Sequence, residues 1–332
     1  MNKTKTAEFP LVTFCLFSYN QEKYIQEAVK GALAQTYSPL EIIISDDCST
    51  DSTYTIIQKV VGEYTGPHSV VLNRNDQNLG IAAHVNHVFS LAHGELFIVA
   101  AGDDISFPCR TEILVKCWLP NRETVFAIAS SAICIDESGC QCGRLMFNRY
   151  GIDLRNKLDV LTDNHWFGCA AAISAKLYYH FSNLNFCSAE DRPYFRRACL
   201  LGSVFRIWIP LLFYRTGGVS SNRIELGFRQ KNKTFFSMSF AGRKQFISDL
   251  KKVSLGSQMG DIKGWGMKCY KMDFLKTRLV GGGFCQRVTA WLGLFFYISF
   301  KNWIANIVYL FPSCFDSFTV FLGRNLWSEK IG

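Results

Sequence analysis

The first hundred residues alternate continuous apolar runs with segments of helical period. The runs cover residues 11–18, 41–45 and 70–73, and a fourth run begins at Leu96. Between them, apolar residues recur three and four positions apart, which predicts helices over residues 21–34, about 49–63 and 81–92. Strands that are apolar on both faces are typical of a sheet covered by helices on each side. The pattern predicts an α/β fold with a mostly parallel central sheet and right-handed crossovers.

The alternation continues less regularly after the fourth strand. We expect a helix over residues 111–118, a strand over 125–135, a loop over 143–163 and a strand-like segment over 166–174. A helix is expected over residues 192–201. For residues 204–214 the sequence predicts either two strands or one strand bent around Pro210.

Charge divides the chain into two parts. The formal net charge is +9, but residues 1–221 hold 19 Lys and Arg against 21 Asp and Glu, whereas residues 222–332 hold 17 against 6. With 48% hydrophobic and 19% charged residues the chain is globular rather than disordered. We therefore expect a domain over 1–221 and a basic, aromatic-rich helical extension over 222–332.

The basic extension suits an anionic surface, and its aromatic content favours lipid over nucleic acid. Residues 291–300 and 307–311 are apolar, but a bilayer span needs about 20 uninterrupted residues. They suit the membrane interface, with Trp291, Phe295, Trp303 and Phe311 at the acyl boundary. The alternative is a helical pair packed on the first domain or on a second copy. We expect no nucleic-acid partner, since no recognised module is visible.

Cysteine and histidine spacings indicate little metal or redox chemistry. The chain has thirteen cysteines, an odd number without a Cys-x-x-Cys pair, and we interpret its start as a strand rather than an export signal. Reduced thiols in a cytoplasmic protein are expected, with Cys140 and Cys142 structural or on the surface. His84 and His87 have ligand spacing but no third partner nearby. Neither a dinucleotide fingerprint nor a P-loop is present.

Three acidic pairs carry the candidate chemistry. Asp46-Asp47 and Asp103-Asp104 each follow an apolar strand, and Glu190-Asp191 begins a helix. Open α/β sheets bind ligands just beyond the carboxyl ends of their strands. Taken alone, Asp103-Asp104 is better explained as an acidic turn after a core strand, and the functional interpretation depends on all three pairs together.

The three pairs, in this order and with their flanking residues, resemble the family 2 glycosyltransferases, which are inverting enzymes with the GT-A fold. The matching motifs span residues 10–221: TFCLFSYN from Thr13, EIIISDDCSTDST from Glu41, Asn78-Leu79-Gly80 with Asn86, Gly102-Asp103-Asp104, and Glu190-Asp191. The resemblance implies a GT-A domain of the bacterial surface-polysaccharide type, followed by a C-terminal helical extension.

The resemblance also implies roles for individual residues. The nucleotide sugar, UDP- or dTDP-linked, would be bound by a set drawn from several motifs: Ser18, Tyr19, Asn20, Asp46, Asp47, Asn78, Gly80 and Asp103. Asp103 and Asp104 would hold Mg2+ or Mn2+, and Asp191 would be the catalytic base beside Glu190. One position departs from the family pattern, because the first acid of the D-x-D motif falls at Ala101.

Physical chemistry supports these implied roles. A sugar diphosphate leaves with growing negative charge, which a carboxylate-bound divalent cation neutralises as a Lewis acid. Inversion needs one base on the face opposite the leaving group, and Asp191 can deprotonate the acceptor hydroxyl there.

The expected function is therefore transfer of a sugar, with inversion, to a hydroxyl of a lipid-linked glycan in polysaccharide, O-antigen or capsule biosynthesis. The acceptor would be a glycan or polyprenyl-linked molecule. The protein would lie in the cytoplasm, peripheral on the inner face of the plasma membrane. The alternative, motivated by Ala101, is a catalytically inactive nucleotide-sugar-binding or assembly subunit.

Overall fold

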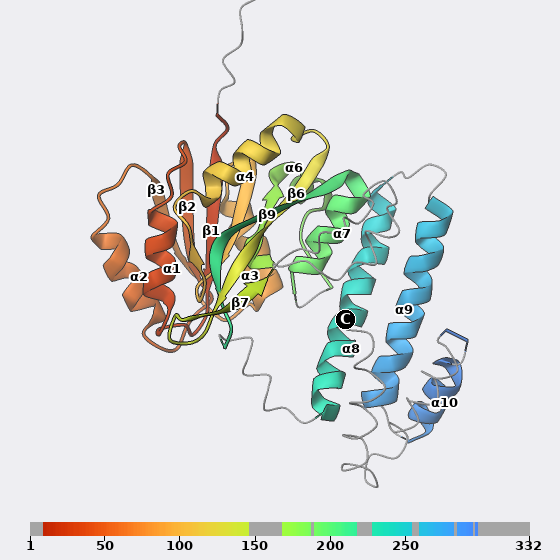
Figure 1. Cartoon of the computed structure of the whole chain (residues 1–332). Helices are drawn as coiled ribbons and strands as arrows, with labels where there is room; N and C mark the ends of the chain where they lie inside the picture. The colour runs from red at the N-terminus through yellow and green to blue at the C-terminus, as the bar shows by residue number, and fades with distance from the viewer. Residues whose placement is uncertain are drawn as a thin grey trace, which may run out of the picture. The chain divides into compact units, whose positions relative to one another are not determined.

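The computed structural model describes residues 9–145, 168–186, 189–217, 228–253, 259–281, 284–294 and 296–297 (Figure 1). The chain forms two compact units, Met1–Asn222 and Arg223–Gly332. Most of the loop expected over 143–163 lies outside the described residues, as do Phe295, Trp303 and Phe311.

The first unit is built on one mixed sheet of nine strands, in the order β3-β2-β1-β4-β8-β6-β9-β5 with β7 beside β6. Its first four strands run parallel: β1 (Val12–Ser18), β2 (Leu40–Asp46), β3 (Ser69–Arg74) and β4 (Leu96–Ala101). Helices α1 (Ile25–Leu33), α2 (Thr53–Gly62) and α3 (Ile81–Leu91) connect them. The sequence prediction of an α/β fold with crossovers is confirmed for this part.

The second half of the sheet reverses direction. β8 (Ala171–Ser174) is antiparallel to β4, and β6 (Val125–Ile135) is antiparallel to β8. β9 (Ser203–Arg215) runs parallel to β6, while β5 (Ile105–Ser106) and β7 (Gln141–Leu145) add short antiparallel pairings. The remaining helical elements are α4 (Arg110–Trp118), η1 (Leu119–Asn121), η2 (Gly168–Ala170), α6 (Ala175–Phe181) and α7 (Asp191–Leu201).

Two expectations for this half are resolved by the structure. Residues 204–214 form one strand rather than two, and its pairing with β6 is irregular at the bend: Ile207 pairs with Ser130 while Pro210 pairs with Ser131. The proline therefore lies at a bulge, where a missing N–H is tolerated. Of the strand-like segment expected over 166–174, the structure describes residues 168–174, in which Gly168–Ala170 forms a 3-10 turn and Ala171–Ser174 is strand.

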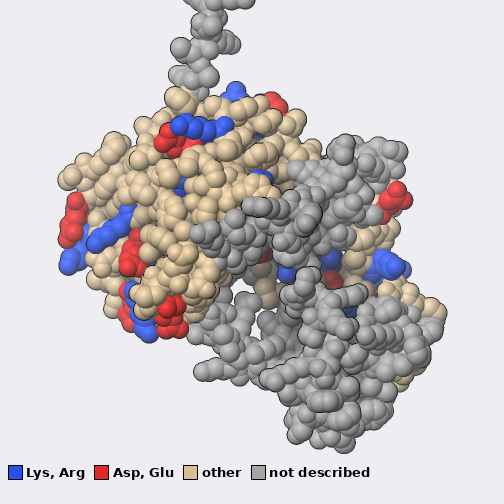
Figure 2. All heavy atoms as spheres, viewed as in Figure 1, with Lys and Arg blue, Asp and Glu red and all other residues tan. Residues whose placement is uncertain are grey.

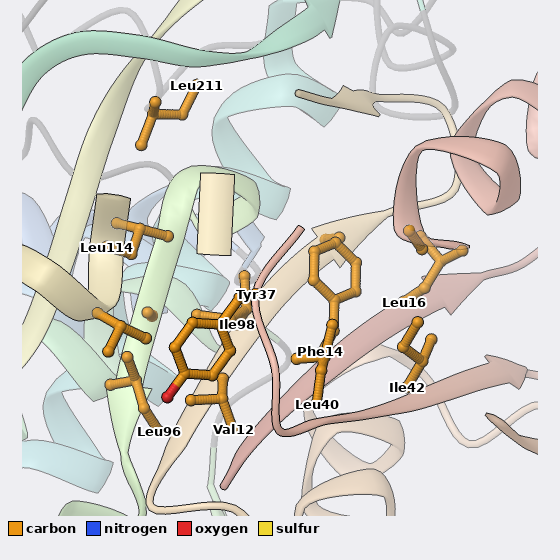
Figure 3. Packing of buried hydrophobic residues seen from close by; sticks show 14 of the residues in the cluster. Val12, Phe14, Leu16, Tyr37, Leu40, Ile42, Leu96, Ile98, Leu114 and Leu211 are labelled. Carbon is orange, nitrogen blue, oxygen red and sulfur yellow. The ribbon is translucent and has the colours of Figure 1, made fainter. Parts of the chain in front are cut away.

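The core explains why the strands are apolar on both faces. Every residue of β1 and β2 is buried, whereas the edge strand β3 alternates between exposed and partly buried positions. Phe14, Ile42 and Ile98 from adjacent strands pack together, and Leu114 of α4 and Leu211 of β9 complete the same cluster (Figure 3). On the surface of this unit, acidic and basic side chains lie beside one another (Figure 2).

The second unit is helical. α8 (Phe228–Asp249) and η4 (Leu250–Lys252) precede α9 (Met259–Gly281) and α10 (Phe284–Leu294). A small apolar cluster of Leu279, Ala290 and Leu294 joins α9 to α10. None of the described helices is both long enough and apolar enough to cross a bilayer.

Candidate active site

Strand register brings the predicted site residues to one edge of the sheet. Ser18 at the end of β1 pairs with Asp46 at the end of β2, and Phe17 pairs with Ala101 at the end of β4. Parallel strands in this register present their carboxyl ends side by side, as the sequence analysis expected. The first two acidic pairs therefore lie at a common edge.

Asp46 is fully buried and is held by hydrogen bonds. Its carboxylate accepts the Ser49 backbone N–H at 2.8 Å and the Ser18 hydroxyl at 3.3 Å. The Nε atom of Arg74 lies 3.6 Å from the same carboxylate. A buried carboxylate requires such partners, so the sequence between Asp46 and Ser49 forms a tight turn around it.

Asp47 is buried as well and fastens the loop that leads into α3. Its oxygens accept the Asn75 amide at 2.8 Å, the Leu79 N–H at 2.9 Å and the Gly80 N–H at 2.9 Å. Asn78 also accepts the Gly80 N–H at 2.9 Å, and Gly80 has a φ of 75°, a conformation that favours glycine. Asp47, Asn78 and Gly80 thus form one hydrogen-bonded loop.

Tyr19 and Asn20 lie where β1 ends. Asn20 adopts a positive φ of 50°, its N–H donates to the Ser49 hydroxyl at 2.9 Å, and its side-chain oxygen accepts the Thr50 N–H at 2.9 Å. The turns after β1 and β2 are therefore tied to each other. Tyr19 keeps 36% of its surface exposed, so its ring remains available to a ligand.

Asp103 and Asp104 differ in environment although they are adjacent. Asp103 is half-buried, whereas Asp104 is buried and accepts the backbone N–H of Arg215 at 2.9 Å through Oδ1. The Oδ2 atom of Asp104 is buried without a hydrogen bond of ordinary geometry among the described residues. Burial, together with the charge of Asp103, raises the pKa of Asp104 to about 7.

Two buried arginines support this turn, and the sequence analysis missed both. Arg215 donates through Nε to the Asp103 carbonyl at 3.1 Å, and its guanidinium lies 4.5 Å from the Tyr24 ring centroid. Arg110 donates through Nη2 to the carbonyls of Val99 and Cys169, both at 2.7 Å. In the sequence, Arg215 stands out only as an arginine directly after an apolar strand. Its hydrogen-bond partners are remote in sequence, so its role could not be predicted from that position.

The turn η2 connects the second acidic pair to the third. The Cys169 thiol interacts with Asp104, and a Cβ atom on the adjacent Gly168 would lie 2.8 Å from Glu190 Oε1 and 3.2 Å from Asp191 Cβ. Gly168 therefore packs directly against Glu190-Asp191. The structure therefore places the acids at the end of β4 and those at the start of α7 next to the same short turn.

Glu190 and Asp191 sit at the N-terminus of α7 and both are partly buried. Burial and the neighbouring Asp191 charge raise the pKa of Glu190 to about 7. The Arg192 N–H donates to Asp191 Oδ1 at 2.7 Å. Asn86 of α3 holds the segment before α7 through two hydrogen bonds with the Leu184 backbone, at 2.8 and 3.0 Å.

The two histidines of α3 belong to a hydrogen-bonded network behind the strand ends. His84 Nε2 lies 2.6 Å from the Ser45 hydroxyl, which also accepts the Asn73 amide at 2.8 Å. His87 Nε2 lies 3.4 Å from the Asn73 side-chain oxygen. Burial lowers the pKa of His84 to about 4, although Asp47 and Asp46 oppose the shift, so His84 is neutral at pH 7.

The donors near Asp103 fit a divalent cation that is completed by its substrate. No cluster of three or more His, Cys, Asp or Glu side chains among the described residues is arranged to hold a metal unaided. Mg2+ is usually bound by one or two carboxylates together with substrate phosphates and water. The half-buried Asp103 carboxylate offers such oxygens, and Asp104 Oδ2, which makes no hydrogen bond of ordinary geometry among the described residues, is a second candidate.

The sheet and its flanking helices have the GT-A fold. Chains with the same fold include S. aureus TarS 1–349 in complex with UDP-GlcNAc, at a TM-score of 0.57 and 14% identity, covering 90% of this chain and 81% of that one. The mannosyltransferase PcManGT from Pyrobaculum calidifontis, in complex with GDP-Man and Mn2+, aligns with a TM-score of 0.51 and 17% identity over 98% of this chain and 89% of that chain.

The chain belongs to glycosyl transferase family 2, whose model matches residues 13–178, half of the chain. The putative glycosyltransferase EpsE of Bacillus subtilis is 31% identical over 137 residues, 41% of this chain and 48% of that protein. The chondroitin synthase of Pasteurella multocida is 34% identical over 113 residues, 34% of this chain and 11% of that protein. The matched region thus spans about half or less of these curated relatives.

Proposed function

We propose that this protein transfers a sugar, with inversion, from a nucleotide-diphosphate donor to a hydroxyl of a lipid-linked glycan during surface-polysaccharide synthesis. The observation that carries the proposal is the turn η2, whose adjacent residues Cys169 and Gly168 contact Asp104 and Glu190-Asp191 respectively. A diphosphate anchored near the first group and an acceptor hydroxyl beside the second would meet next to this turn. Polyprenyl-linked glycans are the acceptor class that fits a basic C-terminal unit.

The donor nucleotide would bind over the ends of β1 and β2. Tyr19 offers an exposed ring for the base, and Ser18 and Asn20 lie at the same edge. The buried oxygens of Asp46 and Asp47 are engaged by the protein itself, so we assign these residues to shaping the pocket wall and the Asn78-Gly80 loop. The UDP-GlcNAc and GDP-Man bound by the two structural relatives support a nucleotide-sugar donor.

Asp103, with Asp104 behind it, would hold Mg2+ or Mn2+ against the diphosphate. The cation supplies Lewis-acid neutralisation of the charge that develops on the leaving diphosphate. The task of the protein is to keep both carboxylates in place, which Arg215 does through the Asp103 carbonyl and the Asp104 carboxylate.

Asp191 would act as the base that removes the proton of the acceptor hydroxyl. It is the first residue of α7, where the helix dipole stabilises a negative charge, and it is partly exposed. Glu190, whose pKa is raised to about 7, becomes neutral below that pH and then no longer adds a second negative charge beside the base.

The test is a panel of UDP-, dTDP- and GDP-sugars, scored for donor turnover with and without Mn2+, on the wild type and on Asp191→Asn. Loss of a general base lowers kcat by about 10²- to 10⁴-fold. The control Asp261→Asn alters an exposed acid in the second unit and should leave turnover unchanged. NMR of the product anomer tests inversion.

Full sugar transfer by Asp191→Asn in a reconstituted pathway would contradict the proposal that this protein is an enzyme. That outcome supports the alternative motivated by Ala101, a binding or assembly subunit without catalysis.

A further inference from the structure

Helix α9 presents one face to the protein and another to solvent. Its buried face packs on α8, where a Cβ atom on Gly266 would lie 2.8 Å from the Phe246 ring and where Asp273 accepts the Ser239 hydroxyl at 2.8 Å. Leu279 packs into the apolar cluster shared with α10. These contacts fix which side of α9 points away from its neighbours.

The exposed face forms a continuous stripe of basic and apolar side chains, which we call the α9 stripe: Lys263, Met267, Lys271, Phe274 and Arg278. These residues are spaced three and four positions apart, so they line one side of the helix over roughly 22 Å. Met267 and Phe274 are each 40% exposed. The Arg278 guanidinium lies 5.4 Å from the centroid of the Phe274 ring.

Acidic residues do not neutralise this stripe. Asp261 of α9 is exposed, but it lies two positions before Lys263 and therefore on another side of the helix. Asp249 and Asp273 are buried, where Asp249 accepts the Gln245 amide at 3.0 Å and Asp273 lies 3.5 Å from Arg243 Nε. Among the described residues, no carboxylate pairs with Lys263, Lys271 or Arg278. An ordinary solvated helix face mixes both signs of charge, and this one carries a single sign around two apolar side chains.

The sequence analysis expected one aromatic residue of α10 at the membrane interface, but this residue packs against other residues of the protein. Trp291 packs against the apolar cluster of Leu279, Ala290 and Leu294. Leu292 on α10 and Phe296 just after it are exposed apolar side chains, but α10 carries one basic residue, Arg287. Within the described part of the second unit, a row of several cations interleaved with exposed apolar groups therefore lies on α9.

We propose that the α9 stripe is the surface by which this protein docks on an anionic bilayer. Lysine and arginine would face the headgroups while Met267 and Phe274 enter the acyl boundary, the arrangement of an interfacial amphipathic helix. This geometry sets the orientation of α9 on the bilayer, with the helix axis parallel to the membrane plane. The inference rests on the membrane contact in the proposed function and names the surface that makes it.

The experiment measures sedimentation of the full-length protein with sucrose-loaded vesicles of 30% phosphatidylglycerol in phosphatidylcholine. Each cation near such a surface contributes about 1 kcal/mol, or about 5-fold in binding. Lys271→Gln with Arg278→Gln should therefore weaken partitioning about 25-fold. Lys251→Gln with Lys252→Gln removes the same charge from exposed positions outside the stripe and should change partitioning less than 3-fold.

A second variant isolates the apolar part of the stripe. Met267→Ser with Phe274→Ser keeps the charge, so initial attraction to anionic vesicles should remain while partitioning falls about 10-fold. Circular dichroism should show retained helix content, because both side chains are 40% exposed and the substitution removes one ring contact to α8, that of Phe274 with Phe240 at 5.6 Å. Donor turnover without vesicles should also be unchanged, which separates docking from catalysis.

Three outcomes would overturn the inference. Equal losses in the Lys251-Lys252 control would show a diffuse charge effect rather than a surface on α9. A change of oligomeric state in the serine variant, seen by analytical ultracentrifugation, would make the stripe a protein contact. Failure of the wild type to bind vesicles would remove the membrane contact itself while leaving the transferase proposal standing.

Discussion

Replacing Arg215 with methionine tests how the turn at Asp103-Asp104 is held. The arginine is buried at the end of β9 and donates to the carbonyls of Asp103, Asp136 and Glu137 at 3.1, 3.1 and 3.3 Å. Its Nη2 lies 2.6 Å from Glu27 on α1. Methionine keeps most of the apolar volume but removes every one of these hydrogen bonds.

The expected loss of local stability is about 3 kcal/mol. Each of the three carbonyls loses a hydrogen bond worth about 0.5–1 kcal/mol after rehydration at the partly exposed turns. Because Glu27 is 57% exposed, its ion pair adds less than about 1 kcal/mol. The cation–π contact with Tyr24 adds about 0.5–1 kcal/mol.

Hydrogen exchange followed by mass spectrometry measures this loss where it occurs. About 3 kcal/mol corresponds to exchange roughly 100-fold faster in peptides covering residues 96–108 and 203–217. Arg122→Met, which removes only surface contacts with Glu95 and Glu123, should leave both peptides within about 3-fold of the wild type. Unchanged exchange in Arg215→Met would refute the view that this arginine holds the Asp103-Asp104 turn.

Three further predictions concern the acids and the glycine at this edge. Because the pKa of Glu190 is raised to about 7, the charge beside the base changes near that pH, so kcat/KM should show an inflection near pH 7 that Glu190→Gln removes from the pH-rate profile. Because the pKa of Asp104 is raised to about 7, the folded state binds its proton more tightly than the unfolded state. Stability is therefore lost as pH rises from about 4 to 7, and Asp104→Asn should melt at a higher temperature than the wild type at pH 8 but not at pH 4. Gly102→Ala places a methyl group 2.4 Å from a side-chain oxygen and 2.9 Å from a methyl carbon, and should lower stability by about 1–3 kcal/mol in thermal melts, whereas Gly260→Ala meets open space and should not.

Local patterns were sufficient to predict the parallel half of the sheet. The strands ending at Ser18, Asp46 and Ala101 are apolar on both faces and have helices between them, so their type, their direction and the position of the following acids could all be predicted. The structure places those acids at one edge, as expected.

The antiparallel half depends on pairings between remote segments. β8 lies between β4 and β6, an order that no periodicity encodes. The inward orientation of the Asp47 oxygens is likewise invisible in sequence, because it depends on the backbone of Leu79 and Gly80, 32 and 33 residues away. Arg215 is 111 residues from Asp104, so its role emerges only once β9 is placed.

The long connections that hold the acids also govern when the site can form during folding. Asp104 is fixed by Arg215 across 111 residues, and the segment before α7 is fixed by Asn86 across 98. Closing such large loops is entropically unfavourable and slow, so these contacts form after the helices and local strand pairs. During refolding, donor turnover should therefore recover later than helix content, and a nascent chain released before β9 has emerged would carry the strand acids without the means to hold them.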